Sequence, residues 1–303
     1  SGHDGRRRGF CETAERPDIS FEWDEIYKND KLIQEYNRIG TKTRLNVYSV
    51  SKSVTAIGIG IAIDEGLLRL EQKVSDFYPE YLGICPQITK ITIRDLLTMT
   101  CGLKEQLFFS DDPERYIVKD WVDYFMKSEF AYEPGEHFEY CNFNTYILAC
   151  IIEKVSSETL LSYMTSRFFN KIGIGNPDWL VCPKGHNTAA NGLLLTIDEM
   201  SRIGRFLLKK GKWNGEQILS ESFIEDATHN HITTNMPKAG YGYQFWINPD
   251  KKSYRADGKY GQYIVVLPEQ QSVITMQALE GRKIFNDVWS ELIVPYMNNQ
   301  ASY

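Results

Sequence analysis

Hydrophobic and polar positions follow strand-like patterns near both ends of this chain and helix-like patterns between them. Over residues 19–36, two short apolar and aromatic runs flank the polar tetrad 28–31, which predicts a β-hairpin. After Gly240, short β-rich runs separated by turn residues predict strands over 241–247, 253–257, 262–267 and 272–279. An amphipathic pattern over 283–296 predicts a closing helix.

The clearest helical pattern covers residues 49–66. Apolar residues recur there at helical spacing, while Gly58 and Gly60 leave a second face small. An interior glycine costs a helix up to about 1 kcal/mol, so close packing against that face should compensate and this helix should be buried in the middle of the protein. Further helices are predicted over 93–100, 116–127, 142–155, 158–170 and 193–210, the last with Thr196 as N-cap and Glu199 completing a capping box.

This order of elements predicts an α+β fold. One antiparallel sheet is built from both ends of the chain and flanked by the first and last helices, and a mainly helical lobe is inserted between the halves. We expect residues 19–72 and 185–303 to form the sheet domain and 73–184 the helical domain, after a flexible leader over 1–18.

Composition narrows the class of protein. The chain has 303 residues, of which 42% are hydrophobic and 24% charged, as in globular proteins. A net charge of -6 argues against nucleic acid as a partner, because phosphate contacts need a basic face. No apolar run reaches the roughly 18 residues that a membrane span needs. The first residues do not form an intact secretory signal, so a cytoplasmic protein is slightly favoured over a processed exported one. The oligomeric state stays open.

The cysteines and histidines do not predict a metal site. Six cysteines lack C-x-x-C spacing and are interpreted as buried thiols, with disulfides possible; they are Cys11, Cys85, Cys101, Cys141, Cys150 and Cys182. His229 and His231 have no acidic or cysteine partner at ligand spacing, so the segment between them is interpreted as a polar loop. We expect no metal and no cofactor.

Candidate chemistry begins at the predicted buried helix, which opens with Ser49-x-x-Lys52. Positions i and i+3 share one helix face. A lysine at the mouth of an apolar helix is partly desolvated, which favours the neutral amine that can accept a serine proton. The helix N-terminus also offers N–H groups to an oxyanion. The same spacing fits a second interpretation, in which Ser49 caps the helix and Lys52 is a surface residue.

A second pattern is the Y-x-N of Tyr140 and Asn142, which follows a tight turn and precedes a predicted helix. The pattern also occurs at Tyr27 and Tyr296, in a charged hairpin and near the end of the chain, which are poorer places for a site. Between the two residues, Cys141 should point away from both, since neighbouring side chains in an extended segment alternate.

Five segments in this order resemble the serine β-lactamase and penicillin-binding-protein superfamily, in its class C-like branch with DD-peptidases and esterases. They are YSVSKSV at 48–54, ITIRDLLTMTCGL at 91–103, PGEHFEYCN at 134–142, NGLLLT at 191–196 and GKYGQYI at 258–264. The resemblance implies a fold with a sheet from both termini and a helical lobe, which agrees with the layout above.

The resemblance also implies roles. Ser49 matches the acylated nucleophile, Lys52 its activating partner, and Tyr140 the residue that shares base work and protonates the leaving group. Asn142 and, more loosely, Gln106 match side chains that bind the substrate amide. The backbone N–H groups of Ser49 and Lys259 match the oxyanion hole. This chemistry is acyl transfer without a metal or cofactor.

The third motif departs from the pattern, because Ala256-Asp257-Gly258 stands where the family usually has Lys-Thr-Gly or His-x-Gly. Gly258 would let a substrate lie against the strand. Asp257 would repel a substrate carboxylate, which weakens the β-lactamase and carboxypeptidase alternatives, although Lys259 or Arg255 could restore a positive charge. The Gly-x-x-Gly-Gln ending resembles the subset that cleaves amides and esters, including linear amide oligomers.

We therefore expect a serine hydrolase that cleaves an amide or ester of a small-molecule or peptide-like substrate through an acyl-Ser49 intermediate. A true class C-like β-lactamase or DD-peptidase is the first alternative. A non-catalytic binding protein that retains the pocket is the second.

Overall fold

The computed structural model describes residues 21–106, 108, 112–236 and 239–300. The leader expected over 1–18 lies outside the described residues. Within them, eight strands form one antiparallel sheet in the order β2-β1-β12-β11-β10-β9-β8-β7. Strand β1 (Phe21–Lys28) pairs with β12 (Ser272–Ala278), which joins the two ends of the chain in one sheet. The predicted α+β fold, with an antiparallel sheet from both termini, is confirmed.

The predicted N-terminal hairpin is present, formed by β1 and β2 (Lys31–Asn37). Its two turn residues, Asn29 and Asp30, have φ angles of 48° and 65°. Asparagine and aspartate tolerate this left-handed region best among residues with a side chain, so these two residues suit the turn that joins β1 to β2.

Most C-terminal strands also agree with the sequence pattern. Strands β10 (Tyr254–Gly258), β11 (Gln262–Leu267) and β12 lie within a residue of their predicted bounds. The single strand predicted over 241–247 is wrong. It is divided into β8 (Gly240–Tyr241) and β9 (Trp246–Ile247), because the chain reverses between them and Gln244 turns inward to donate its side-chain Nε2 to the Leu97 carbonyl at 2.8 Å.

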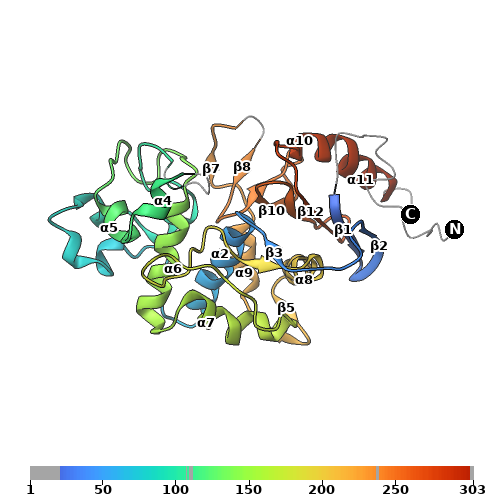
Figure 1. The fold of residues 1–303 in the computed structure, drawn as a ribbon, viewed down its shortest axis with the longest axis horizontal. Helices are drawn as coiled ribbons and strands as arrows, with labels where there is room; N and C mark the ends of the chain where they lie inside the picture. The colour runs from blue at the N-terminus through green and yellow to red at the C-terminus, as the bar shows by residue number, and fades with distance from the viewer. Residues whose placement is uncertain (1–20, 107, 109–111, 237–238, 301–303) are drawn as a thin grey trace.

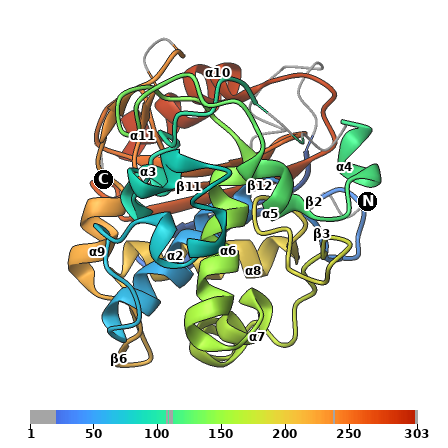
Figure 2. The same ribbon diagram turned by 90° about the vertical axis from the view of Figure 1, so that its left-hand side faces the viewer.

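Helices cover both faces of the sheet (Figure 2). On one face α8 (Ile197–Leu208) packs on β1, β11 and β12. Its predicted capping box is confirmed, since Thr196 Oγ1 accepts the Glu199 N–H and Glu199 accepts that of Thr196. The opposite face carries the closing helix, which is divided into α10 (Phe285–Val288), the π-helical η6 (Trp289–Ile293) and α11 (Val294–Gln300).

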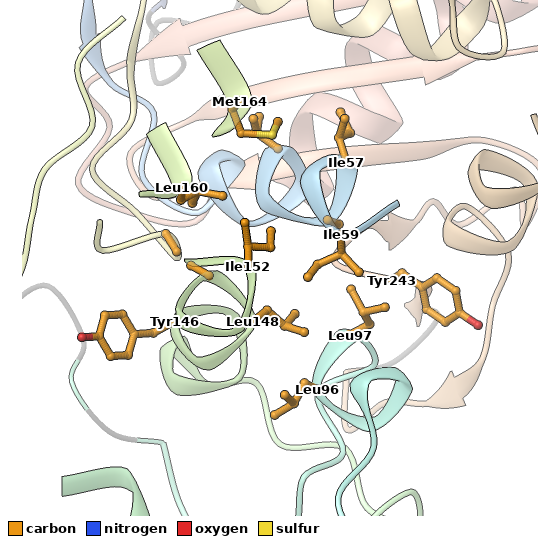
Figure 3. Packing of buried hydrophobic residues seen from close by; sticks show 14 of the residues in the cluster. Ile57, Ile59, Leu96, Leu97, Tyr146, Leu148, Ile152, Leu160, Met164 and Tyr243 are labelled. Carbon is orange, nitrogen blue, oxygen red and sulfur yellow. The ribbon is translucent and has the colours of Figure 1, made fainter. Parts of the chain in front are cut away.

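Helix α2 (Val50–Asp64) lies between the sheet and the remaining helices (Figure 1). Every residue from Val50 to Ala62 is buried, as the sequence predicted for this helix. Figure 3 shows its apolar side chains packed among those of α3 (Ile93–Leu97), α6 (Asn142–Ser156) and α7 (Leu160–Met164). Close packing at the glycines is confirmed, because a methyl group on Gly60 would lie 2.5 Å from the Phe223 ring.

The helical segment between residues 73 and 184 is more broken than its pattern predicts. The helix expected over 116–127 divides into α4 (Glu114–Ile117) and α5 (Trp121–Met126), because Asp120 caps a new helix by accepting the Asp123 N–H. The helix expected over 158–170 changes from α7 to the π-helical η4 (Thr165–Phe169) and the 3-10 turn η5 (Asn170–Ile172). Short 3-10 turns η1, η2 and η3 occupy Val74–Asp76, Pro79–Tyr81 and Pro86–Thr89.

A few short elements have no counterpart in the predictions. They are helix α9 (Glu221–Ala227) and the strands β3 (Leu45–Asn46), β4 (Leu194–Leu195), β5 (Lys212–Trp213), β6 (Glu216–Gln217) and β7 (Ile232–Thr233). In the described part of the chain, no helix combines the length and the apolar character needed to cross a membrane.

Candidate active site

The start of α2 is held by a short β-ladder and one asparagine. Strand β3 pairs with β4, and Asn46 Oδ1 accepts the N–H of Tyr48 at 2.8 Å and that of Gly192 at 3.1 Å. Tyr48 has a φ of 48°, a backbone conformation that side-chain-bearing residues adopt only at a cost of about 1 kcal/mol or more. The strained turn delivers the next residue, Ser49, to the first turn of α2 beside the loop that contains Ala190 and Asn191.

Ser49 and Lys52 are in direct contact. Lys52 Nζ lies 2.8 Å from Ser49 Oγ, and the Lys52 residue is 1% exposed. Ser49 occupies the N-cap position, but its side chain caps no backbone N–H. The interpretation of Ser49 as a capping side chain and Lys52 as a surface residue is therefore wrong.

The Lys52 amine is surrounded by acceptors. Besides Ser49 Oγ, it lies 2.8 Å from Asn142 Oδ1 and 3.1 Å from the Ala190 carbonyl oxygen. Burial lowers the pKa of Lys52 to about 7, with the charge of Arg115 acting in the same direction. A neutral amine has two N–H groups and one lone pair. It can donate to Asn142 and Ala190 while it accepts the hydroxyl proton of Ser49.

Tyr140 approaches the same serine from the segment between the turn at 134–136 and α6. Burial raises the pKa of Tyr140, and a hydrogen bond with Ser49 opposes that rise. Its ring lies 5.6 Å from the Trp246 ring and 4.7 Å from Lys52 Nζ, measured to ring centroids. The phenol is thus a proton-bearing donor near neutral pH, beside an amine that is partly unprotonated.

Asn142 connects Lys52 to the helical segment. Its Oδ1 accepts from Lys52 Nζ and its Nδ2 donates to the Phe108 carbonyl oxygen at 2.7 Å. Both ends of this amide are therefore engaged with the protein. Cys141, its neighbour, is fully buried in the main hydrophobic core, as are four more thiols predicted to be buried: Cys85, Cys101, Cys150 and Cys182. Cys11 lies outside the described residues.

The end of β10 lies against the start of α2. A methyl group on Gly258 would come within 2.3 Å of the Val47 carbonyl oxygen and 3.3 Å of the Ser49 backbone nitrogen. A glycine is therefore required where this strand passes the serine. Lys259 follows directly and lines the same cleft as Ser49.

Asp257 and Arg255 form an ion pair on this strand. Arg255 Nε donates to Asp257 Oδ2 at 2.8 Å and Nη1 donates to Asn248 Oδ1 at 2.9 Å, while the guanidinium lies 3.5 Å from the centroid of the Phe285 ring. Burial raises the pKa of Asp257, and the charges of Arg255 and Lys283 oppose the rise. The Asp257 side chain is 25% exposed and that of Arg255 7%, so the carboxylate is the more accessible end of the pair.

These residues line one cleft of about 680 Å³. It contains all the predicted site residues except Lys52, which lies beneath Ser49: Ser49, Gln106, Tyr140, Asn142, Asp257, Gly258 and Lys259. A larger cavity of about 1050 Å³ lies against α9 and β7–β9 and includes none of them. Within the described residues, no cluster of three or more His, Cys, Asp or Glu side chains is placed to hold a metal ion.

Sequence reasoning gave no role in the site to Asn191 or Arg115, and it assigned Trp246 mainly to the core, with the rim of the cleft as the lesser alternative. Trp246 and Asn191 line the cleft, and Arg115 donates through Nη2 to Asn191 Oδ1 at 2.7 Å. Asn191 opens one of the segments that carried the family resemblance, which was the available signal. Nothing near Arg115 in the sequence indicates its burial.

The antiparallel sheet and the Ser–Lys pair at the start of a buried helix agree with the family resemblance found in the sequence. A sequence model of the Beta-lactamase family matches residues 26–279, and the chain belongs to this family. The resemblance to serine β-lactamases and penicillin-binding proteins expected from the sequence is thereby confirmed.

One of the curated relatives is named as a hydrolase. The chain is 23% identical over 276 residues to the 6-aminohexanoate-dimer hydrolase of Paenarthrobacter ureafaciens, a match that covers 82% of this chain and 70% of the relative. It is also 29% identical over 133 residues to Protein flp of Staphylococcus aureus, which covers 43% of this chain and 27% of that protein.

Solved structures share the fold. A Bacillus anthracis protein assigned as a 6-aminohexanoate-dimer hydrolase superposes with a TM-score of 0.81 at 21% identity, covering 97% of this chain and 81% of that one. A D-stereospecific amidohydrolase from Streptomyces gives a TM-score of 0.71 at 17% identity, covering 92% and 96%. At these identities the likeness concerns the fold.

Proposed function

We propose that this protein is a serine hydrolase that cleaves an amide or ester by acyl transfer through Ser49. The observation that carries the proposal is the contact of 2.8 Å between Lys52 Nζ and Ser49 Oγ, made by a buried lysine whose pKa is lowered to about 7. A lysine whose pKa lies near neutral pH can accept the proton of a serine hydroxyl that it contacts. The two residues therefore form an activated nucleophile pair.

In the proposed mechanism, neutral Lys52 takes the hydroxyl proton as Ser49 Oγ forms a bond to the substrate carbonyl carbon. The backbone N–H groups of Ser49 and Lys259 stabilise the oxyanion that develops. Tyr140 gives its phenolic proton to the leaving nitrogen or oxygen as that bond breaks, which leaves acyl-Ser49. Water then attacks the acyl carbon and gives a proton to the Tyr140 phenolate, and the bond between that carbon and Ser49 Oγ breaks, which releases the acid. Lys52 returns its proton to Ser49 Oγ, so the serine hydroxyl and the neutral amine are restored.

The cleft suits a small-molecule or peptide-like substrate. Its volume of about 680 Å³ lies in the range of small-ligand pockets. Its wall combines aromatic side chains, including Phe138, Trp246 and Phe285, with the carboxylate of Asp257. A relative named 6-aminohexanoate-dimer hydrolase supports an amide as the bond cleaved.

A β-lactamase or DD-peptidase activity is the second candidate, favoured by family membership. Asp257 disfavours it, because penicillins and peptidoglycan stems present a carboxylate and Asp257 is the more accessible end of its ion pair. A binding protein without catalysis is the third candidate, and the intact Ser49–Lys52 contact argues against it.

The test is the mass of the intact protein after incubation with a fluorophosphonate, a penicillin and p-nitrophenyl esters of short and long acids. We expect one adduct on wild type and none on Ser49→Ala. Ser53→Ala is the matched control, because Ser53 lies one turn along α2 and donates to the Gln244 carbonyl. The absence of any adduct on folded wild type would contradict the proposed hydrolase and favour a binding role.

A further inference from the structure

Arg115 is a buried cation with no acidic partner among the residues that the structure describes. The residue is 9% exposed and lies on α4, with its guanidinium carbon 5.6 Å from the centroid of the Trp121 ring. Burial lowers the pKa of Arg115. Within the described residues its side-chain hydrogen bond goes to the neutral amide of Asn191, and burying a cation costs free energy.

Arg115 does not reach the substrate cleft itself. It faces a cavity of about 10 Å³ that is also lined by Asn142, Ala190 and Asn191. Such a volume holds about one water molecule, so no substrate group fits there. Any effect of Arg115 on the reaction therefore passes through its neighbours.

The first neighbour is Asn191, whose orientation Arg115 determines. A guanidinium is a donor only, so Asn191 must present Oδ1 to it, and the contact measures 2.7 Å. The Asn191 carbonyl accepts from Trp179 Nε1 at 3.0 Å and from Thr188 Oγ1 at 2.6 Å, which fixes the backbone. The Nδ2 group has no partner within the described residues, and Asn191 lines the cleft.

Asn191 thereby supplies the kind of donor that Asn142 does not offer. The Nδ2 group of Asn142 is engaged with the Phe108 carbonyl oxygen, whereas that of Asn191 is available. A carbonyl oxygen of the substrate is the complementary acceptor.

The second neighbour is Lys52. Its amine donates to the carbonyl of Ala190, the residue before Asn191, at 3.1 Å. Several charged or titratable groups act on this amine or on its partners. Arg115 opposes protonation of Lys52, Cys141 favours it, and Asp257 acts on Tyr140. Among them Arg115 is the permanent cation.

We infer that Arg115 is a positioning residue, which holds Asn191 as an N–H donor to a second carbonyl oxygen in the acyl part of the substrate and places a positive charge behind Lys52. The inference rests on the proposed acyl transfer at Ser49. It assigns the substrate class as acyl groups that carry an amide or similar carbonyl in addition to the one attacked.

The experiment compares two p-nitrophenyl esters of equal chain length, one a plain alkanoyl ester and one with an amide in the acyl chain. Rates of Ser49 acylation are measured between pH 5 and 9. In Asn191→Leu, we expect kcat/KM for the amide-bearing ester to fall about tenfold, because one hydrogen bond is lost. The plain ester should change less than about twofold.

Arg115→Gln should reduce the preference for the amide-bearing ester and also raise the pH midpoint of acylation, since the cation of Arg115 no longer opposes protonation of Lys52. Arg115→Lys keeps the cation and should keep the midpoint. Arg69→Gln, at an exposed arginine, is the matched control.

The inference is overturned if Asn191→Leu leaves the preference between the two esters unchanged, or if folded Arg115→Gln keeps the wild-type midpoint. If Arg115→Gln fails to fold, the preference of Asn191→Leu between the two esters still tests the inference. A wild type that the fluorophosphonate does not label at Ser49 would instead contradict the proposed function.

Discussion

Gly258 and Ser49 come from opposite ends of the chain and meet at the site, where a methyl group on Gly258 would lie 3.3 Å from the Ser49 backbone nitrogen. The end of β10 is thus seated on the start of α2. This contact places the strand that ends at Gly258 beside a proposed oxyanion-hole N–H.

Gly258→Ala should therefore reduce acylation sharply. The added methyl meets the Val47 carbonyl oxygen at 2.3 Å, and since that atom is backbone, the strand or the start of α2 must move. We expect at least a hundredfold loss of fluorophosphonate labelling, the scale of a lost oxyanion donor. Gly83→Ala is the control, because nothing lies within 4 Å of the added methyl. Equal labelling of the two variants would place the oxyanion donors elsewhere.

Lys52→Met should abolish most acylation, by about 10²- to 10⁴-fold, because the base is lost. Its effect on stability depends on pH. The folded pKa of about 7 lies below the ordinary 10.5, so the unfolded chain binds the additional proton between these values and wild type becomes more stable as pH rises.

Urea unfolding at pH 7 and pH 9 measures this effect. The wild-type free energy of unfolding should gain about 2 kcal/mol from this group over the interval, and Lys52→Met should lack that gain. Lys90→Met, at an exposed lysine, should retain the wild-type gain in stability between pH 7 and pH 9. A wild-type slope that survives in Lys52→Met would show that the amine is not the group responsible.

Asp257→Asn should change the preference for charged substrates. The substitution removes the exposed carboxylate and leaves Arg255 unneutralised, so the cleft becomes more positive. We expect the ratio of acylation rates, anionic ester over neutral ester, to rise about fivefold at low salt and less at high salt. Glu269→Gln is a remote carboxylate control, paired with Lys252 on the surface. An unchanged ratio would mean that Asp257 does not face the bound substrate.

Glu25 should make stability depend on pH at a distance from the site. It is buried on β1, where Ser201 Oγ donates to it at 2.7 Å and Lys42 lies at 3.2 Å. Burial raises the pKa of Glu25 above the ordinary 4.5, so between 4.5 and the folded pKa the folded state binds one more proton than the unfolded state. The contribution of Glu25 to stability is therefore lost as pH rises through this interval.

Melting temperatures at pH 5 and pH 8 measure this contribution. Glu25→Gln should show a smaller fall between the two pH values than wild type. Glu35→Gln removes a half-exposed carboxylate that contacts the same lysine, and it should keep the wild-type fall. If both variants behave alike, the loss belongs to the charge cluster as a whole.

Local patterns predicted the elements that carry the site. The apolar spacing around Val54 and Ile57 located α2, and the Ser49–Lys52 spacing placed both side chains on one face of its first turn. Each of these signals lies within a few residues of the feature that it predicts, which is why sequence alone was sufficient.

Long-range contacts were not accessible in this way. The burial of Arg115 depends on Trp121 and Asn191, and the latter is 76 residues away in the chain. The reversal at Gln244 depends on a carbonyl of α3, at Leu97. The sequence also does not reveal that Asn142 engages Phe108 through its amide nitrogen. These features arise from tertiary packing, which overrides local preference.

The burial of Cys141 between Tyr140 and Asn142 has a practical consequence. Its thiol is fully enclosed in the core, so a thiol reagent reaches it only when this stretch of chain separates from the rest. The rate at which Cys141 is modified can be measured by peptide mass. This rate therefore reports how often the segment that holds two of the proposed site residues opens. The protein contains a natural reporter of whether catalysis fails by loss of chemistry or by loss of local structure.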